Sequence, residues 1–258
     1  NNLSQILKLN KMSNQTKSMS FIDHLEELRW RIIKMLSSII LGGVVTFFFI
    51  DFFLELLLKP LENIDSGNPI SLQVLSVQGM FIIKWSIALI GGLITSVPVI
   101  TYQLWKFISP GLYANEKGFV LPLVIFSFIS FLLGIFFSYI ILIPYCLNFF
   151  ASLSGDNILN NFSINHYFSF ITWLLLGCGI VFQLPVISFL LSTIGLLTPA
   201  FMRHFRRHAV VAIFIISSFI TPPDPVSMLV MAFPLIILYE LSIGVSWIVN
   251  RGKEFDSE

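Results

Sequence analysis

Charged residues are scarce in this sequence. Asp, Glu, Lys and Arg make up 11% of its 258 residues, whereas a soluble domain carries roughly 25%. Hydrophobic residues make up 56%, and the mean hydropathy is +0.87. No soluble core can bury that much apolar surface, so an ordinary soluble domain is excluded. The formal net charge of +1 provides no basic field, so nucleic acid is not an expected partner.

Cysteine and enzyme motifs are also nearly absent. The two cysteines, Cys146 and Cys178, lie in apolar runs without CxxC or Cys/His spacing, so neither a disulfide framework nor a metal site is expected. No HExxH, GxSxG or GxxxxGK[ST] pattern occurs, so we expect no enzymatic activity, no cofactor and no ATP coupling in this chain. No cleavable signal peptide is recognisable in the polar N-terminal segment, and we expect the first apolar run to be retained.

The sequence does contain long uncharged runs. A bilayer core of roughly 30 Å needs about 20 apolar residues per helix, and the runs 32–53, 85–105, 118–143 and 167–194 meet this length. The runs 208–223 and 226–239 are shorter, and they predict either two short spans or a re-entrant hairpin. We therefore predict an all-α polytopic membrane protein with six transmembrane helices, the last two short. Pro144 is expected to end the third helix.

Lys and Arg are distributed unevenly between the predicted loops. With the N-terminus inside, 13 of the 15 lie on the cytoplasmic side, and only Lys59 and Lys84 lie at the outer side. This bias predicts that both termini are cytoplasmic. The membrane domain is expected to cover residues 20–249, between polar cytoplasmic tails at 1–19 and 250–258.

Proline and glycine lie inside several predicted spans. Pro98, Pro185 and Pro234 each remove a backbone hydrogen bond and predict kinked helices around a concave bundle. Small residues at 91–92, 177 and 179 would allow helices to approach closely.

Two segments on the predicted cytoplasmic side carry most of the polar chemistry. Residues 20–31 predict an interfacial helix with an apolar stripe at Phe21, Leu25, Leu28 and Ile32. On its opposite face Glu27 can pair with Arg31, although a solvated charge ladder is the alternative interpretation. Residues 101–117 are interpreted as an aromatic connecting loop with the isolated carboxylate Glu116. Its expected interface anchors are Trp105, Phe107 and Tyr113.

Four segments, in order, resemble the TatC family, the signal-recognising core of the twin-arginine protein translocase. They are His24-Leu-Glu-Glu-Leu-Arg-Trp-Arg31, the segment from Pro98 to Glu116, Val181-Phe-Gln-Leu-Pro185, and Ile220-Thr-Pro-Pro-Asp-Pro225. The resemblance extends from about residue 21 to residue 249. The family's six spans and cytoplasmic termini agree with the distribution of Lys and Arg.

The resemblance implies a binding site for the paired arginines of a folded cargo protein's signal peptide. Glu27 and Glu116 match the family's two binding carboxylates, and a carboxylate can hold a planar guanidinium through two hydrogen bonds. Arg29 and Arg31 would help to shape this site, or would act only as topology anchors. The other residues expected around the site are Tyr102, Gln103 and Phe107.

Further matched positions lie elsewhere in the chain. Gln183, where many relatives carry Glu, and Pro185 are expected to contact single-span subunits of the TatA and TatB type. Asp224 matches the family but is equally consistent with a turn or cap residue. Glu240 is either a functional intramembrane carboxylate or an interfacial residue. The remaining matched positions are Pro60, Pro98 and Pro110.

The resemblance also implies an export function driven by the proton-motive force, without a cofactor. Further copies of the chain and membrane lipid are expected partners in a receptor complex. The expected location is the bacterial inner membrane, with an algal plastid or protist mitochondrial membrane as the alternative. A secondary transporter is the alternative function, because kinked helices and isolated polar groups also suit a transporter.

Overall fold

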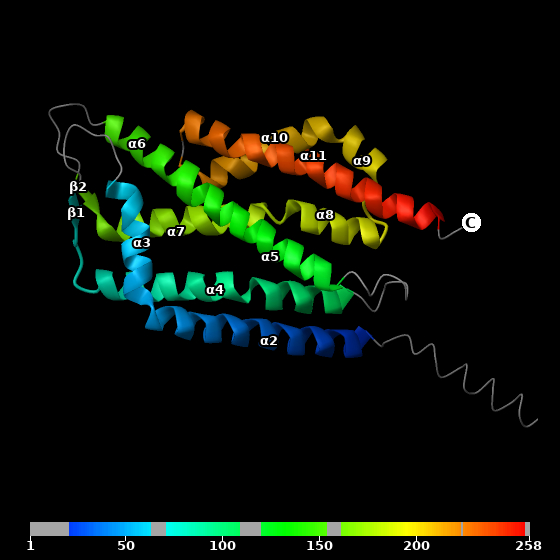
Figure 1. Ribbon diagram of the computed structural model, residues 1–258, viewed down its shortest axis with the longest axis horizontal. Helices are drawn as coiled ribbons and strands as arrows, with labels where there is room; N and C mark the ends of the chain where they lie inside the picture. The colour runs from blue at the N-terminus through cyan, green and yellow to red at the C-terminus, as the bar shows by residue number, and fades with distance from the viewer. Residues whose placement is uncertain (1–20, 63–70, 109–119, 154–160, 223, 256–258) are drawn as a thin grey trace, which may run out of the picture.

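The computed structural model describes residues 21–62, 71–108, 120–153, 161–222 and 224–255, and most of these are helical. Figure 1 shows helices that run along the length of the molecule, with α5 inclined to the others. They are α2 (Phe21–Phe48), α4 (Gly79–Ile108), α5 (Val120–Phe137), α7 (Ile164–Val181), α8 (Leu184–Thr193), α10 (Arg206–Ile220) and α11 (Pro225–Phe255).

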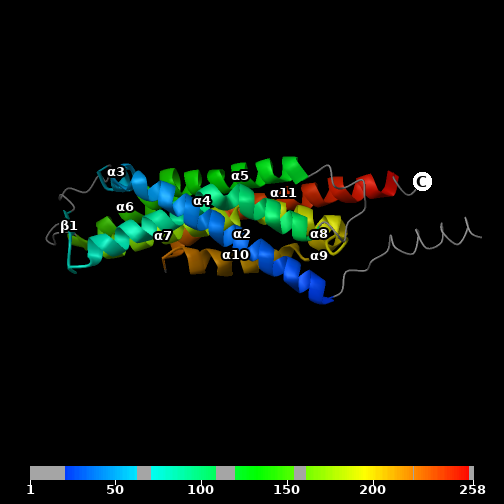
Figure 2. The ribbon, with the colours of Figure 1, turned by 90° about the horizontal axis from the view of Figure 1, so that it is seen from below.

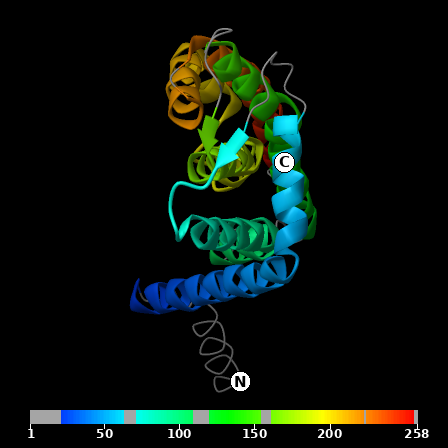
Figure 3. The same cartoon turned by 90° about the vertical axis from the view of Figure 1, so that its left-hand side faces the viewer.

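The start of α2 and the end of α11 lie at the same end of the bundle, which we call the terminal end (Figure 1). Shorter elements cover the opposite, capped end. Figure 3 shows α3 lying across this end beside a pair of short parallel strands. These elements are α3 (Ile50–Glu62), β1 (Ser71–Gln73) and β2 (Asn161–Ser163). The helix α6 (Ile143–Leu153) continues the line of α5 toward the capped end, while α9 (Pro199–His204) lies near the terminal end.

Five helical segments of the described chain are long and apolar enough to cross a membrane. They are His24–Phe48, Gly79–Phe107, Leu121–Leu153, Ile164–Thr193 and Pro225–Asn250. The predicted all-α polytopic membrane architecture is therefore confirmed. With 15 residues, α10 is short as predicted, and whether it makes a sixth crossing stays a prediction.

The last helix is longer than predicted. The sequence predicts a short span because Glu240 interrupts the apolar run, yet α11 continues through Glu240 and has 31 residues. Glu240 accepts a hydrogen bond from Arg206 at 2.7 Å, and both side chains are half exposed. Because the carboxylate is paired at a polar edge of the bundle, it does not have to end the helix.

The third span also passes the residue that was expected to stop it. Pro144 lies in the first turn of α6, and the π-helical turn η3 (Ser138–Leu142) joins α5 to α6. In η3 the backbone N–H of Ile143 donates to the carbonyl of Ser138, five residues earlier. A widened turn just before the proline allows the chain to stay helical despite the missing N–H.

Residues 101–108 form the last two turns of α4 and not part of a loop. No proline or glycine occurs between Thr101 and Pro110, so nothing in this stretch ends the helix. Trp105 is only 1% exposed because it packs on Leu123 and Val186. Its predicted role as an interface anchor is therefore wrong. Tyr113 lies outside the described residues.

The first helix crosses obliquely over α4 and packs along it (Figure 2). Glycines on both helices allow this approach: a Cβ atom added at Gly92 would meet the carbonyl oxygen of Ile39 and, at 2.5 Å, the backbone nitrogen of Gly43. Thr46 is buried in the same interface and donates to the carbonyl of Gly42 at 2.9 Å. Close backbone packing of small residues thus joins α2 to the rest of the bundle.

The main core lies where η3, α6, α7 and α11 meet. Its fully buried side chains include Leu142, Cys146, Leu174, Cys178 and Met231. The two cysteines are free and buried in this core.

Pro60 has a structural consequence at the capped end. It lies inside α3 and has no N–H, so the carbonyl of Leu56, four residues earlier, has no helical donor. The hydroxyl of Tyr139 donates to this carbonyl at 2.7 Å, and the hydroxyl of Tyr167 donates to the carbonyl of Leu57 at 2.7 Å. The two tyrosines thereby fasten α3 to the bundle.

We expect Tyr139→Phe to lower the free energy of unfolding by about 1–3 kcal/mol, because it leaves the Leu56 carbonyl without a donor. Thermal unfolding in detergent measures this. In a Pro60→Ala background the helix supplies its own donor, so the same substitution should cost clearly less. An equal cost in both backgrounds would contradict the proposed link between the proline and the tyrosine.

Candidate functional site

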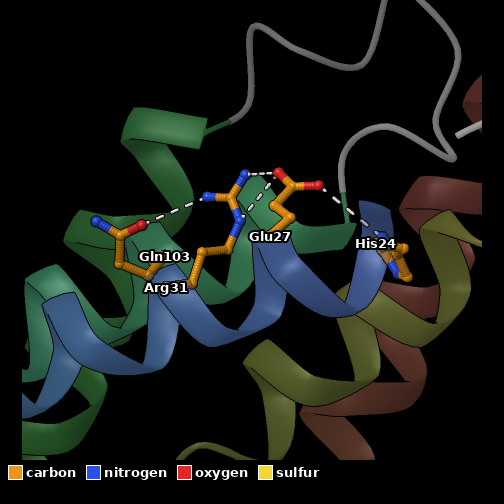
Figure 4. A network of polar contacts seen from close by, with 4 residues as sticks. All are labelled: His24, Glu27, Arg31 and Gln103. Atoms are coloured by element: carbon orange, nitrogen blue, oxygen red, sulfur yellow. Dashed lines mark hydrogen bonds and ion pairs between the residues drawn. The ribbon is translucent and has the colours of Figure 1, made fainter. Parts of the chain in front are cut away.

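The first turns of α2 and the last turns of α4 form a polar corner at the terminal end (Figure 4). Arg31 donates through Nε to Glu27 Oε1 at 3.1 Å and through Nη2 to the same oxygen. Its Nη1 donates to Gln103 Oε1 at 3.4 Å. The predicted pair between Glu27 and Arg31 is confirmed, and Gln103 of α4 extends it across 72 residues of sequence.

The orientation of α2 decides between the two interpretations of its charged face. Arg31 is only 7% exposed, whereas Leu25 and Ile32 from the predicted apolar stripe are exposed. The face that carries Glu27 and Arg31 therefore turns toward α4, whereas Leu25 and Ile32 face outward and Leu28 is half-buried. A solvated charge ladder is excluded for these two residues.

The second carboxylate oxygen of Glu27 is buried and has no hydrogen-bond partner among the described residues. The imidazole of His24 lies nearby, with its Nδ1 3.9 Å from this oxygen. The His24 ring stacks on Phe107 of α4, with ring centroids 4.3 Å apart and an interplanar angle of 13°. A buried carboxylate oxygen without a donor is costly, and it would accept a hydrogen bond from an incoming cation.

The remaining residues predicted for this site differ in their placement. Tyr102 and Arg29 are exposed, and the Nζ atom of Lys106 lies 5.8 Å from the centroid of the Tyr102 ring. Glu116 and Pro110 lie outside the described residues. His24 was not predicted, although its position three residues before Glu27 places it on the same helix face.

A second polar cluster lies within the membrane-spanning part, around Gln183. The chain interrupts its helix at Phe182 and Gln183 and begins α8 at Leu184, with Pro185 in the first turn, where the sequence predicts a kink. Gln183 accepts from Ser127 Oγ at 2.7 Å and donates through Nε2 to the Ser127 carbonyl at 3.0 Å. Thr101 extends the cluster through a 2.8 Å contact with Ser127 Oγ. Hydrogen bonds among these uncharged groups join α4, α5 and the break.

Asp224 caps the start of α11. It is buried, and its Oδ1 accepts from the backbone N–H groups of Val226 at 3.1 Å and Ser227 at 2.7 Å. Its Oδ2 accepts from the Ser227 hydroxyl. The structure thus favours the cap interpretation of this residue. Among the other matched positions, Pro98 lies inside α4.

We expect Asp224→Ala to lower the free energy of unfolding by about 1–2 kcal/mol, because two backbone donors lose their acceptor. Asp224→Asn keeps a capping oxygen and should cost less. Thermal unfolding of the purified protein in detergent tests both variants. If Asp224→Asn is as destabilised as Asp224→Ala, the negative charge and not the cap is what matters.

Comparison with known proteins identifies the family. Residues 23–234 match the model for TatC, the Sec-independent protein translocase protein. The chain belongs to the TatC family. It is 38% identical over 238 residues to the Sec-independent protein translocase protein TatC of Helicobacter pylori strain J99, covering 91% of this chain and 93% of that protein. It is 36% identical to TatCy of Bacillus subtilis strain 168, covering 94% of each chain.

Solved structures agree with this assignment. Two crystal structures of the twin-arginine translocase receptor TatC match the fold, one of them in DDM. Their TM-scores are 0.72 and 0.75 at 33% and 34% identity, and the matches cover 88% and 86% of this chain and 99% of each solved chain.

Membership of the TatC family indicates the cellular location and the general role of the protein. It is a multi-pass protein of the bacterial inner membrane, in agreement with its bacterial relatives and its five apolar spans. It is a component of the twin-arginine translocase, so its role is transport, and it works with other subunits of that translocase.

Proposed function

We propose that this TatC-family protein is the receptor subunit that binds the paired-arginine signal peptide of folded cargo proteins. The site is the polar corner of α2 and α4, with Glu27 as its first carboxylate and Glu116 as its second. In this proposal both termini and the terminal end of the bundle are cytoplasmic, since the positive-inside rule favours that orientation.

The observation that carries the proposal is the buried oxygen of Glu27 that lacks a donor. A charge-assisted hydrogen bond to this oxygen would contribute about 1.5–3 kcal/mol, which corresponds to roughly tenfold to 150-fold in affinity. The ring of Phe107 lies beside the corner and offers a face on which a guanidinium can stack. Tyr102, Gln103, Arg29 and Arg31 would complete the surroundings.

We further propose that single-span subunits contact the break between α7 and α8. Gln183 is half-buried, and its amide group has one N–H beyond the bond to Ser127. Such a donor, next to a helix broken by Pro185, would suit a polar group on a partner helix in lipid. An ion-coupled transporter usually carries ionisable groups within the membrane. The cluster of Thr101, Ser127 and Gln183 is uncharged and hydrogen-bonded, so it does not favour that alternative. In our proposal the proton-motive force therefore acts on the assembled translocase.

Equilibrium binding of fluorescent signal peptides to the purified protein in detergent tests the receptor proposal. The pair of peptides should differ only in Arg-Arg against Lys-Lys. We expect the Arg-Arg peptide to bind at least about tenfold more tightly, because an ammonium lacks the planar pair of donors. Equal affinity for the two peptides, or no binding of either, would exclude the proposed receptor role.

A further inference from the structure

The negative charge of Glu27 is neutralised by the positive charge of Arg31. Arg31 donates twice to Oε1, and no further carboxylate of the described chain forms an ion pair with either residue. Together the two side chains carry no net charge. The pair of Glu27 and Arg31 therefore attracts a cation only weakly at long range.

We do not expect an incoming arginine to displace Arg31 from Glu27. It is 7% exposed, and among the described residues its one other hydrogen-bond partner is the neutral amide oxygen of Gln103 at 3.4 Å. Removing its counter-charge would leave a buried guanidinium unpaired, which is strongly destabilising. Glu27 must therefore keep Arg31 on Oε1 and can offer a ligand only Oε2.

The surroundings of Oε2 suit a flat group. The imidazole of His24 lies nearly parallel to the Phe107 ring, with Nδ1 3.9 Å from Oε2. A planar cation stacked on Phe107 could thus reach this oxygen from the place that the His24 ring now occupies. A guanidinium has this shape, and an ammonium does not.

We propose that Arg31 is a specificity-determining residue of this site, which neutralises Glu27 so that ligands are selected by the shape of their donors and not by their charge. The inference rests on the proposed receptor function. It explains how a carboxylate site could reject lysine-rich segments, which would be attracted by an uncompensated negative charge.

Gln103→Glu gives the sharpest test, because it adds one negative charge beside Arg31 with almost no change in shape. We expect the Lys-Lys peptide to bind roughly threefold to tenfold more tightly, since the corner becomes anionic and a cation is then attracted by charge alone. The Arg-Arg peptide should gain less, so the ratio of the two affinities should fall. The gain for Lys-Lys should shrink at high salt.

Arg31→Gln and Arg31→Lys separate charge from structure. Arg31→Gln also leaves the corner anionic and should lower the Arg-Arg to Lys-Lys ratio in the same direction, whereas Arg31→Lys keeps the corner neutral and should preserve weak Lys-Lys binding. Arg203→Gln is the matched control, because it removes an exposed arginine in α9, apart from the corner, and should leave the ratio unchanged.

The outcomes separate this inference from the receptor function. If the wild type prefers Arg-Arg but Gln103→Glu leaves the ratio unchanged, or lowers both affinities in parallel, Arg31 does not set the specificity and only this inference fails. If the wild type shows no preference at all, the receptor function fails and the inference with it. Gln103→Glu keeps the test decisive even if the Arg31 variants do not fold.

Discussion

Glu27→Gln is expected to lower the affinity for an Arg-Arg signal peptide by about tenfold to 150-fold, the loss of one charge-assisted hydrogen bond. The substitution removes the negative charge and replaces one carboxylate oxygen by a donor. It also leaves the buried Arg31 without a counter-charge, so the corner becomes cationic and repels the peptide. Titration of a fluorescent peptide measures the effect.

Glu26→Gln is the matched control for this experiment. Glu26 is the neighbouring carboxylate, exposed on a different face of α2, and its loss changes the net charge by the same amount. A similar loss of affinity in both variants would mean that overall charge, and not the corner, binds the peptide. Thermal unfolding of both variants must accompany the titration, because an unpaired Arg31 also lowers stability.

Gly92→Ala is expected to destabilise the protein by about 3 kcal/mol or more, at the upper end of the cost of overpacking a core. The new methyl group would meet the backbone of α2 at Ile39 and Gly43. Backbone atoms cannot rotate away as a side chain can, so α2 would have to separate from α4. The α2 residues of the polar corner would then move relative to Gln103 and Phe107.

Gly244→Ala provides the comparison, since a Cβ atom at Gly244 has no neighbour within 4 Å. This variant should be at least as stable as the wild type, because alanine is the better helix former. Thermal unfolding in detergent distinguishes the two. Equal stability of both variants would show that α2 and α4 do not need to pack as closely as the structure has them.

The long apolar runs predicted most of the membrane architecture, and the failures have local causes. Pro144 and Glu240 both looked like helix ends. A π-helical turn accommodates the first, and an ion pair with Arg206 accommodates the second. Both compensations depend on contacts or backbone geometry that hydrophobic length does not reveal.

In the candidate site, the contact within α2 was predictable from the sequence, but the contacts between α2 and α4 were not. The spacing of Glu27 and Arg31 predicted their pairing, because residues four apart are neighbours on a helix. Their contact with Gln103 depends on how α2 is rotated and shifted against α4, and this follows from the packing of the two helices, including the close approach at Gly92. For the same reason the stacking of His24 on Phe107 was not foreseen.

The most direct test of the proposed receptor site is photo-crosslinking of a signal peptide that carries a photoreactive residue next to its paired arginines. After binding to the purified protein in detergent, the sites of attachment are mapped by mass spectrometry. We predict that they fall in the first turns of α2, around His24 and Glu27, and in the last turns of α4, around Gln103 and Phe107. Attachment mainly to α3, β1 or β2 at the capped end would contradict the proposed site.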